Sequence, residues 1–161
     1  IDNMPYYAYS RDNGDSWSDA MMIAPPIGLV GTGFPVVTAG SEGRVAFGYV
    51  GDIGNQTWHG YMTLLTDAFS DNPLFTTVQV NQPDDPIDSS NAYPEGCGYE
   101  RCGGLGDFLD MAVDQYGRPW FSLANNDAGE IGIFATITNG PSLRGDLVDL
   151  NPMPLGGNLT L

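Results

Sequence analysis

The stretch that most constrains the fold is residues 10–17, which read SRDNGDSW. It lies between an aromatic run at residues 6–9 and an apolar run at residues 20–24. Short polar side chains such as that of Asp12 can accept hydrogen bonds from nearby backbone N–H groups, and Gly14 tolerates a positive φ. The stretch therefore predicts a tight hairpin turn between two strands.

The spacing of Ser10, Asp12, Gly14 and Trp17, with Ser16 before the tryptophan, is rarer than a plain polar turn. It resembles the Asp-box, or BNR repeat, of sialidase-like β-propellers. The resemblance implies a structural turn between the third and fourth strands of a blade, away from the ligand face. It therefore predicts a fold and indicates little about activity. We expect the Trp17 ring to fold under the turn and anchor it.

The composition favours many short strands. The 161 residues include 22 glycines and 12 prolines, scattered among aromatic and β-branched residues. A chain of this length is expected to form one domain. It contains no apolar stretch of about 20 residues, so we expect no membrane span. Because it starts with Ile1, we expect a processed chain or a fragment.

The charge balance is strongly acidic. Twenty Asp and Glu residues face five arginines and no lysine, which gives a net charge of −15. Repulsion from phosphate groups argues against nucleic-acid or anionic-membrane partners. An acidic surface of this kind fits salty or calcium-containing surroundings, and we expect an extracellular, secreted protein.

Two segments repeat at an offset of 74 residues, marked by the Gly-Arg pairs at 43–44 and 117–118. Each copy reads as a strand, a turn ending in Gly-Arg, and a second strand. Third strands are expected at residues 58–65 and 131–138, and fourth strands at 74–81 and, more weakly, at 147–150. The alternative is a chance similarity between two hairpins. The matched apolar pairs are Phe34 and Phe108, Val37 and Met111, Ala39 and Val113, and Phe47 and Phe121.

A repeat of four strands is typical of β-propeller blades. We expect residues 1–30 to end one blade, 31–81 to form a full blade, 82–107 to be an inserted loop, and 108–161 to form a further blade and tail. The all-β chain would then cover about two and a half to three blades, and closed propellers have roughly four to eight. The sequence therefore predicts a partial propeller of four-stranded antiparallel blades.

In the resembled family, loops that join second to third strands, and blade to blade, meet at the ligand face. Here these are residues 24–33, 51–57, 83–107 and 125–130. The longest is the segment 83–107, and long loops on rigid scaffolds often hold function. Its candidate ligand-binding residues are Tyr99, Glu100 and Arg101. Alternatively, the loop covers a seam between blades.

Catalysis is the competing expectation. The resemblance implies an arginine triad for a substrate carboxylate, a tyrosine nucleophile assisted by glutamate, and an aspartate acid/base. Among the five arginines only Arg101 lies in a candidate ligand loop, Arg144 is ambiguous, and no Phe-Arg-Ile-Pro motif occurs. A complete triad is not assignable, so the catalytic residues stay unknown.

Calcium is a possible cofactor, because Asp84, Asp85 and Asp88 offer closely spaced oxygens. A second oxygen-rich stretch runs from residue 125 to Glu130. Neither follows an EF-hand spacing, and a solvated acidic loop is the alternative. His59, the single histidine, is expected to be a packed residue and not a base.

Cys97 and Cys102 enclose a short glycine-rich loop, and a disulfide between them is feasible. Free thiols and, less favoured, a metal site are the alternatives. Two sequons, at Asn55 and Asn158, are compatible with export. We expect an Asp-box propeller segment that recognises glycans or a partner chain. The alternatives are part of an exo-sialidase-type glycoside hydrolase, or a structural subunit that completes a ring with other chains.

Overall fold

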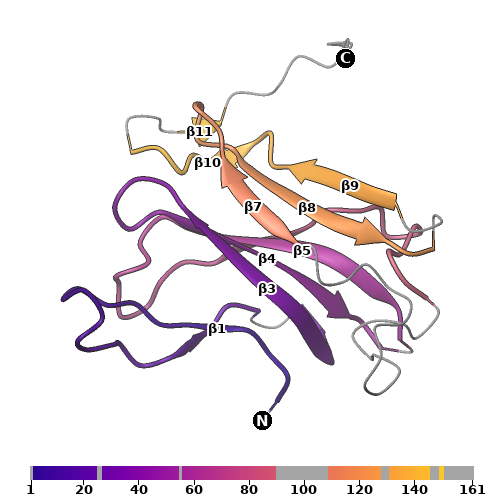
Figure 1. The fold of residues 1–161 in the computed structure, drawn as a ribbon, viewed down its shortest axis with the longest axis horizontal. Helices are drawn as coiled ribbons and strands as arrows, with labels where there is room; N and C mark the ends of the chain where they lie inside the picture. Colours follow the sequence, from indigo (N-terminus) through magenta and orange to yellow (C-terminus); the bar gives the residue numbers. More distant parts are fainter. Residues whose placement is uncertain are drawn as a thin grey trace.

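The computed structural model describes residues 2–24, 27–54, 56–89, 109–127 and 131–145, and the strand Asp149–Leu150. In these residues the regular structure is antiparallel β-sheet without a helix (Figure 1), so the all-β expectation is confirmed. The strands are β1 (Tyr6–Tyr7), β2 (Met21–Met22), β3 (Gly31–Ala39), β4 (Val45–Asp52), β5 (Trp58–Leu65), β6 (Thr76–Gln79), β7 (Asp110–Val113), β8 (Pro119–Asn125), β9 (Ile131–Thr136), β10 (Gly140–Pro141) and β11 (Asp149–Leu150).

The largest sheet contains β3, β4, β5 and β6 in chain order, each antiparallel to the next. This is the four-strand unit that the sequence predicted, with a shorter fourth strand than expected. All eight residues of β5 are buried. A strand that is buried on both faces needs other layers on both sides of its sheet.

The sheet of β7, β8 and β9 repeats the first three strands of the larger sheet. Val37 pairs with Phe47 in the larger sheet, and Met111 pairs with Phe121 at the same offset of 74 residues. The turns match too, because the Gly40 N–H donates to the Arg44 carbonyl (2.9 Å) and the Asp114 N–H donates to the Arg118 carbonyl (3.0 Å). Gly43 and Gly117 both have a positive φ, at 74° and 83°. The repeat therefore extends to the strand register.

The expected fourth strand of this second unit pairs differently. β11, at Asp149–Leu150, lies antiparallel to β10 and not to β9. The segment after β9 passes beside the turn before β8, where the Leu143 N–H donates to the Gly117 carbonyl (2.9 Å). The second unit therefore has three strands in its sheet within the described part of the chain.

β1 and β2 flank the turn at residues 10–17 and pair as expected, with Tyr6 opposite Met22 and Tyr7 opposite Met21. The expected anchoring by Trp17 is wrong, because this side chain is 65% exposed. The space beneath the turn is taken by Tyr9 and Phe69, whose ring centroids lie 5.0 Å apart, with the Arg11 guanidinium 4.4 Å from the Phe69 centroid. The turn itself is held by polar contacts.

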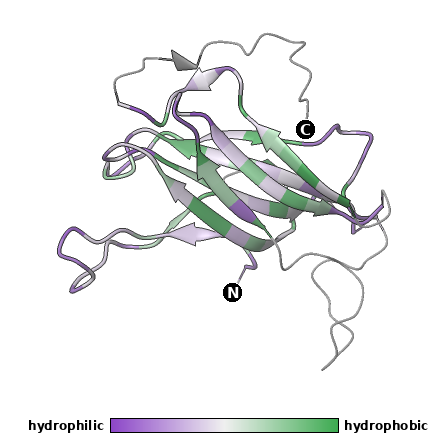
Figure 2. Ribbon diagram, turned by 45° about the horizontal axis from the view of Figure 1, so that its top comes forward, coloured by the Kyte–Doolittle hydropathy of each residue, from purple (hydrophilic) through white to green (hydrophobic). Residues whose placement is uncertain are grey.

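The sheets stack face to face in three layers: β1–β2, β3–β6, and β7–β9 (Figure 1). One core lies between the four-stranded sheet and β7–β9 and contains Met62, Met111 and Phe121. The other core lies between the four-stranded sheet and β1–β2 and contains Tyr7 and Tyr49. Hydrophobic residues are concentrated in the strands, and the turns are mostly hydrophilic (Figure 2).

Candidate functional site

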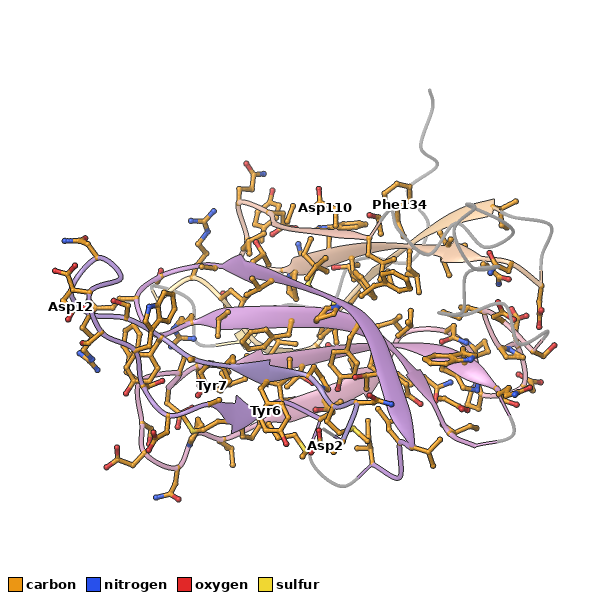
Figure 3. All side chains as sticks on the ribbon, turned by 60° about the horizontal axis from the view of Figure 1, so that its bottom comes forward. Asp2, Tyr6, Tyr7, Asp12, Asp110 and Phe134 are labelled. Atoms are coloured by element: carbon orange, nitrogen blue, oxygen red, sulfur yellow. The ribbon has the colours of Figure 1, made fainter. Side chains whose placement is uncertain are left out.

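Because successive antiparallel strands reverse direction, the connections alternate between two ends of the layers. One end, here called the turn end, holds the turns at residues 10–17, 40–44, 66–75 and 114–118. Figure 3 shows Asp12 at the extremity of this end. The other end, the loop end, comprises the described parts of residues 24–33, 51–57, 82–89 and 125–127.

The loop end is a continuous hydrogen-bonded unit. The Val30 N–H donates to the Asp52 carbonyl (2.9 Å), which ties the loop before β3 to the end of β4. Trp58, the first residue of β5, exchanges two backbone hydrogen bonds of 2.9 Å with Ile87 and Asp88. The Asn126 N–H donates to the Ile87 carbonyl (2.8 Å). The described parts of the four loops that the sequence assigned to one face therefore meet at one end of the layers.

Asp88 is the central polar residue of the loop end. It is 0% exposed, and its Oδ2 accepts a hydrogen bond from Asn126 Nδ2 (2.8 Å). Next to it, the Ser89 N–H and hydroxyl both donate to the Asp127 carboxylate, at 3.1 and 2.7 Å. A buried carboxylate needs such donors to offset its lost hydration. These bonds join the segment after β6 to the segment after β8.

The predicted calcium ligands do not form a cluster. Asp84 and Asp85 are exposed, and Asp88 is buried against Asn126. Among the described residues, no group of three His, Cys, Asp or Glu side chains could hold a metal ion. Asn125 and Asn126 also lie in the loop end, and Glu130 is outside the described residues.

The predicted ligand residues Tyr99, Glu100 and Arg101 lie outside the described residues, as do Cys97 and Cys102. The ligand site and the disulfide therefore stay predictions. The structure describes the residues just before this segment. Asp88 is hydrogen-bonded to Asn126, and Ser89 is hydrogen-bonded to Asp127.

His59 is packed, as expected, and is 1% exposed. Asn81 lies beside the imidazole ring. Its Oδ1 accepts a hydrogen bond from the Gly60 N–H (2.9 Å), and its amide nitrogen lies 2.8 Å from His59 Nδ1. With the amide oriented in this way, Nδ1 is the acceptor and the proton of the neutral ring is on Nε2. Burial lowers the pKa of His59 below its ordinary value of 6.5. The ring is a structural part of the sheet.

The four arginines in the described residues belong to the turn end. Arg11 lies over the Phe69 ring, and Arg44 Nη1 donates to the Ser142 carbonyl. Arg118 pairs with the Asp114 carboxylate at 3.8 Å, and Arg144 donates to the Asp114 carbonyl (3.4 Å). None of these four is in the loop end, so they do not form an arginine triad there.

Ser10, Asp12 and Gly14 hold the turn at residues 10–17 together. Ser10 Oγ donates to Asp12 Oδ1 (2.7 Å) and accepts from the Gly14 N–H (2.8 Å). The Ser16 N–H and hydroxyl donate to the same carboxylate at 2.9 and 2.6 Å. The bonds from Ser16, and that from Ser10, lower the pKa of Asp12 to about 2. Gly14 has a φ of 98°, which L side chains rarely adopt.

A cavity of about 550 Å³ lies between β1 and the first hairpin of the four-stranded sheet, and sequence reasoning missed it. One wall is formed by residues 6–9 and the other by β3 and β4, including Pro35, Val37 and Phe47. The repeat could have indicated the cavity, because Val37 has the same place in its hairpin as Met111, and Met111 is buried. Within the described residues, the layer in front of Val37 has two strands and the layer in front of Met111 has four.

Comparisons with protein-family models, with curated proteins and with solved structures found no match. In the described part of the chain no helix is long and apolar enough to cross a membrane.

Proposed function

We propose that the chain is part of a sialidase-like, Asp-box β-propeller that acts outside the cell as a recognition module. Its loop end would bind a glycan or a partner chain. Support for the propeller comes from the repeated strand register, with Val37–Phe47 and Met111–Phe121 at equivalent places, and from the face-to-face stacking of sheets. Radial repetition of antiparallel sheets is the arrangement of propeller blades.

The observation that carries the functional proposal is the hydrogen-bonded loop end around Asp88. This buried carboxylate and the adjoining backbone connect β5 to the segments that follow β6 and β8. Binding residues are often placed on loops that a rigid scaffold positions. The segment 90–108, with Tyr99, Glu100 and Arg101, departs from this frame and supplies the proposed ligand contacts.

The net negative charge of the chain limits how an anionic sugar could bind. With 20 acidic residues against five arginines, an anionic sugar meets a repulsive field, and Arg101 is the single cation of the segment 83–107. An arginine fork suits a carboxylate. Arg101, or bound calcium, would therefore be needed for an acidic glycan to bind.

An exo-sialidase is the second function. Because the four described arginines are engaged at the turn end, a carboxylate-binding triad would need Arg101 together with arginines from outside this chain. Hydrolysis of a sialoside by the complete protein would favour the enzyme over the recognition module.

The test is calorimetry of the complete protein with a sialylated trisaccharide, with and without calcium. We expect Arg101→Ala to weaken binding by about 1–3 kcal/mol, the range for a lost hydrogen bond to a charged group. Arg11→Ala is the matched control, because Arg11 packs on Phe69 at the turn end and should leave the affinity unchanged. Equal affinities for both variants and the unmodified protein would contradict the proposed site.

A further inference from the structure

The turn at residues 10–17 contains an Asn-Gly pair, Asn13 and Gly14, and both residues are exposed. Asparagine is a chemically labile residue, because its side-chain amide can be attacked by the backbone nitrogen of the next residue. Glycine in that next position has no Cβ to hinder the attack. The turn therefore places a reactive pair in contact with solvent.

The attacking nitrogen of this pair is hydrogen-bonded to Ser10. The Gly14 N–H donates to Ser10 Oγ at 2.8 Å. The Ser10 hydroxyl in turn donates to Asp12 Oδ1 (2.7 Å), which leaves a lone pair of Oγ for the Gly14 amide. The N–H and hydroxyl of Ser16 fix the Asp12 carboxylate, at 2.9 and 2.6 Å. The Gly14 amide is therefore the last member of a chain of hydrogen bonds within the turn.

The same bonds hold the backbone of the pair. Asn13 has a φ of 61° and Gly14 a φ of 98°, both in the left-handed region that asparagine and glycine tolerate. Attack on the side chain requires the Gly14 nitrogen to lose its proton, and this is the proton that Ser10 accepts. Amides that are hydrogen-bonded in a folded protein lose their protons mainly after local opening. The closed turn should therefore slow the reaction.

We propose that Asn13 is a site of spontaneous deamidation, and that the hydrogen bond from Gly14 to Ser10 protects it in the folded chain. When the turn opens, the deprotonated Gly14 nitrogen bonds to Cγ of Asn13. The bond from Cγ to the side-chain nitrogen breaks, and this nitrogen takes up a proton and leaves as ammonia. Water then opens the succinimide ring at either carbonyl and gives aspartate or isoaspartate. The net change consumes one water molecule and releases one ammonia molecule.

Either product should weaken the turn. Each adds a negative charge between Asp12 and Asp15, where like charges repel one another. Isoaspartate also adds a carbon atom to the main chain, which changes the spacing that the bonds of Ser10 and Ser16 span. Deamidation is therefore an irreversible loosening of the turn. The inference does not depend on the function proposed for the loop end, because this turn belongs to the turn end.

Peptide mapping of the complete 161-residue chain tests the proposal. Trypsin cleaves after Arg11 and Arg44 and releases the peptide 12–44, in which Asn13 is the single asparagine. Mass spectrometry of this peptide measures the conversion of amide to acid during incubation near neutral pH. We expect steady conversion in urea, where the turn is unfolded. Conversion in the folded chain should be slower by at least about 10-fold, because only the open fraction reacts.

Ser10→Ala removes the acceptor and should speed conversion in the folded chain by about 2–10-fold, the rate equivalent of one lost hydrogen bond. Ser10→Thr keeps a hydroxyl and should restore slow conversion. Ser16→Ala is the matched control, because it removes a bond to Asp12 from the same turn and keeps the acceptor of Gly14. Its conversion should stay close to that of the unmodified chain.

Three results would overturn the proposal. The first is equally fast conversion of the unmodified chain when folded and in urea. The second is no conversion of the peptide 12–44 in urea. The third is the same acceleration in Ser16→Ala as in Ser10→Ala. Circular dichroism shows whether the variants keep the β spectrum. If Ser10→Ala does not, the comparison of the folded and urea-unfolded unmodified chain, together with Ser10→Thr, decides the outcome.

Discussion

Gly48 of β4 lies directly against the ring of Phe121 in β8. A Cβ placed on Gly48 would be 2.7 Å from two carbons of this ring and 3.0 Å from the Met111 sulfur. Phe121 is 0% exposed, so its ring has little room to move. The glycine therefore sets how closely the two larger sheets approach.

Replacing Gly48 by alanine tests this contact. We expect Gly48→Ala to lower the free energy of unfolding by about 1–3 kcal/mol, because it overpacks a filled core. In Gly132→Ala the new Cβ meets nothing within 4 Å, so stability should be unchanged or raised by up to about 1 kcal/mol. Urea denaturation of both variants gives the comparison. Equal stabilities would mean that the two sheets do not pack as described.

The turn at residues 10–17 should respond to acid through Asp12. Its carboxylate has a pKa of about 2, lowered from 3.8, so its contribution is complete above about pH 3.8 and is lost as the pH falls through 2. Between these values the melting temperature of the unmodified chain should fall more steeply than that of Asp12→Ala. Asp15→Ala changes a neighbouring carboxylate of the same turn and should keep the steep fall. Parallel acid profiles for the chain and Asp12→Ala would show that these hydrogen bonds are not formed.

Replacing the exposed Trp17 should have almost no effect on the free energy of unfolding. We expect Trp17→Ala to change the free energy of unfolding by less than about 0.5 kcal/mol, as for other surface substitutions. Phe121→Ala, which removes a fully buried ring, should cost about 3–5 kcal/mol. Thermal unfolding followed by circular dichroism measures both. A large loss in Trp17→Ala would restore the anchoring role that the sequence suggested.

His59 should make the sheet sensitive to mild acid. Because burial lowers its pKa below 6.5, the unfolded chain takes up a proton before the folded chain does. Stability should therefore fall as the pH drops below 6.5 and level off below the lowered pKa. Urea unfolding at about pH 7.5 and about pH 5.5 should show this loss in the unmodified chain and a smaller one in His59→Gln. With a single histidine in the sequence, no other imidazole contributes. The same pH dependence in both chains would assign the effect elsewhere.

Much of the strand order could be predicted from the sequence. The Gly-Arg pairs at 43–44 and 117–118 marked two turns with the same backbone geometry, because glycine there adopts a positive φ. The apolar residues around them aligned Val37 with Met111, and the structure supplied the cross-strand partner of each. The pairing of β11 with β10 could not be predicted in this way, because a two-residue strand has too little pattern to choose a partner.

The candidate site was predicted as a set of loops and not as contacts. The alternation of strand direction places residues 51–57, 82–89 and 125–127 at one end, which follows from the number of strands alone. The hydrogen bond between Asp88 and Asn126 did not follow from it. Three aspartates close in sequence suggested a metal site, but backbone pairing with β5 buried one of them and left the other two in solvent.

The sequence by itself determined the local geometry, namely the turn at residues 10–17 and the order of the longer strands, because these depend on side chains and φ preferences within a few residues. Only the tertiary structure decided which faces are covered. Val37 and Met111 occupy equivalent places in their hairpins, yet one is 60% exposed and the other 8%. In the part of the chain that the structure describes, the layer in front of Met111 has four strands and the layer in front of Val37 has two. Burial is a property of packed neighbours, so identical local patterns can end in a core or beside an open cavity.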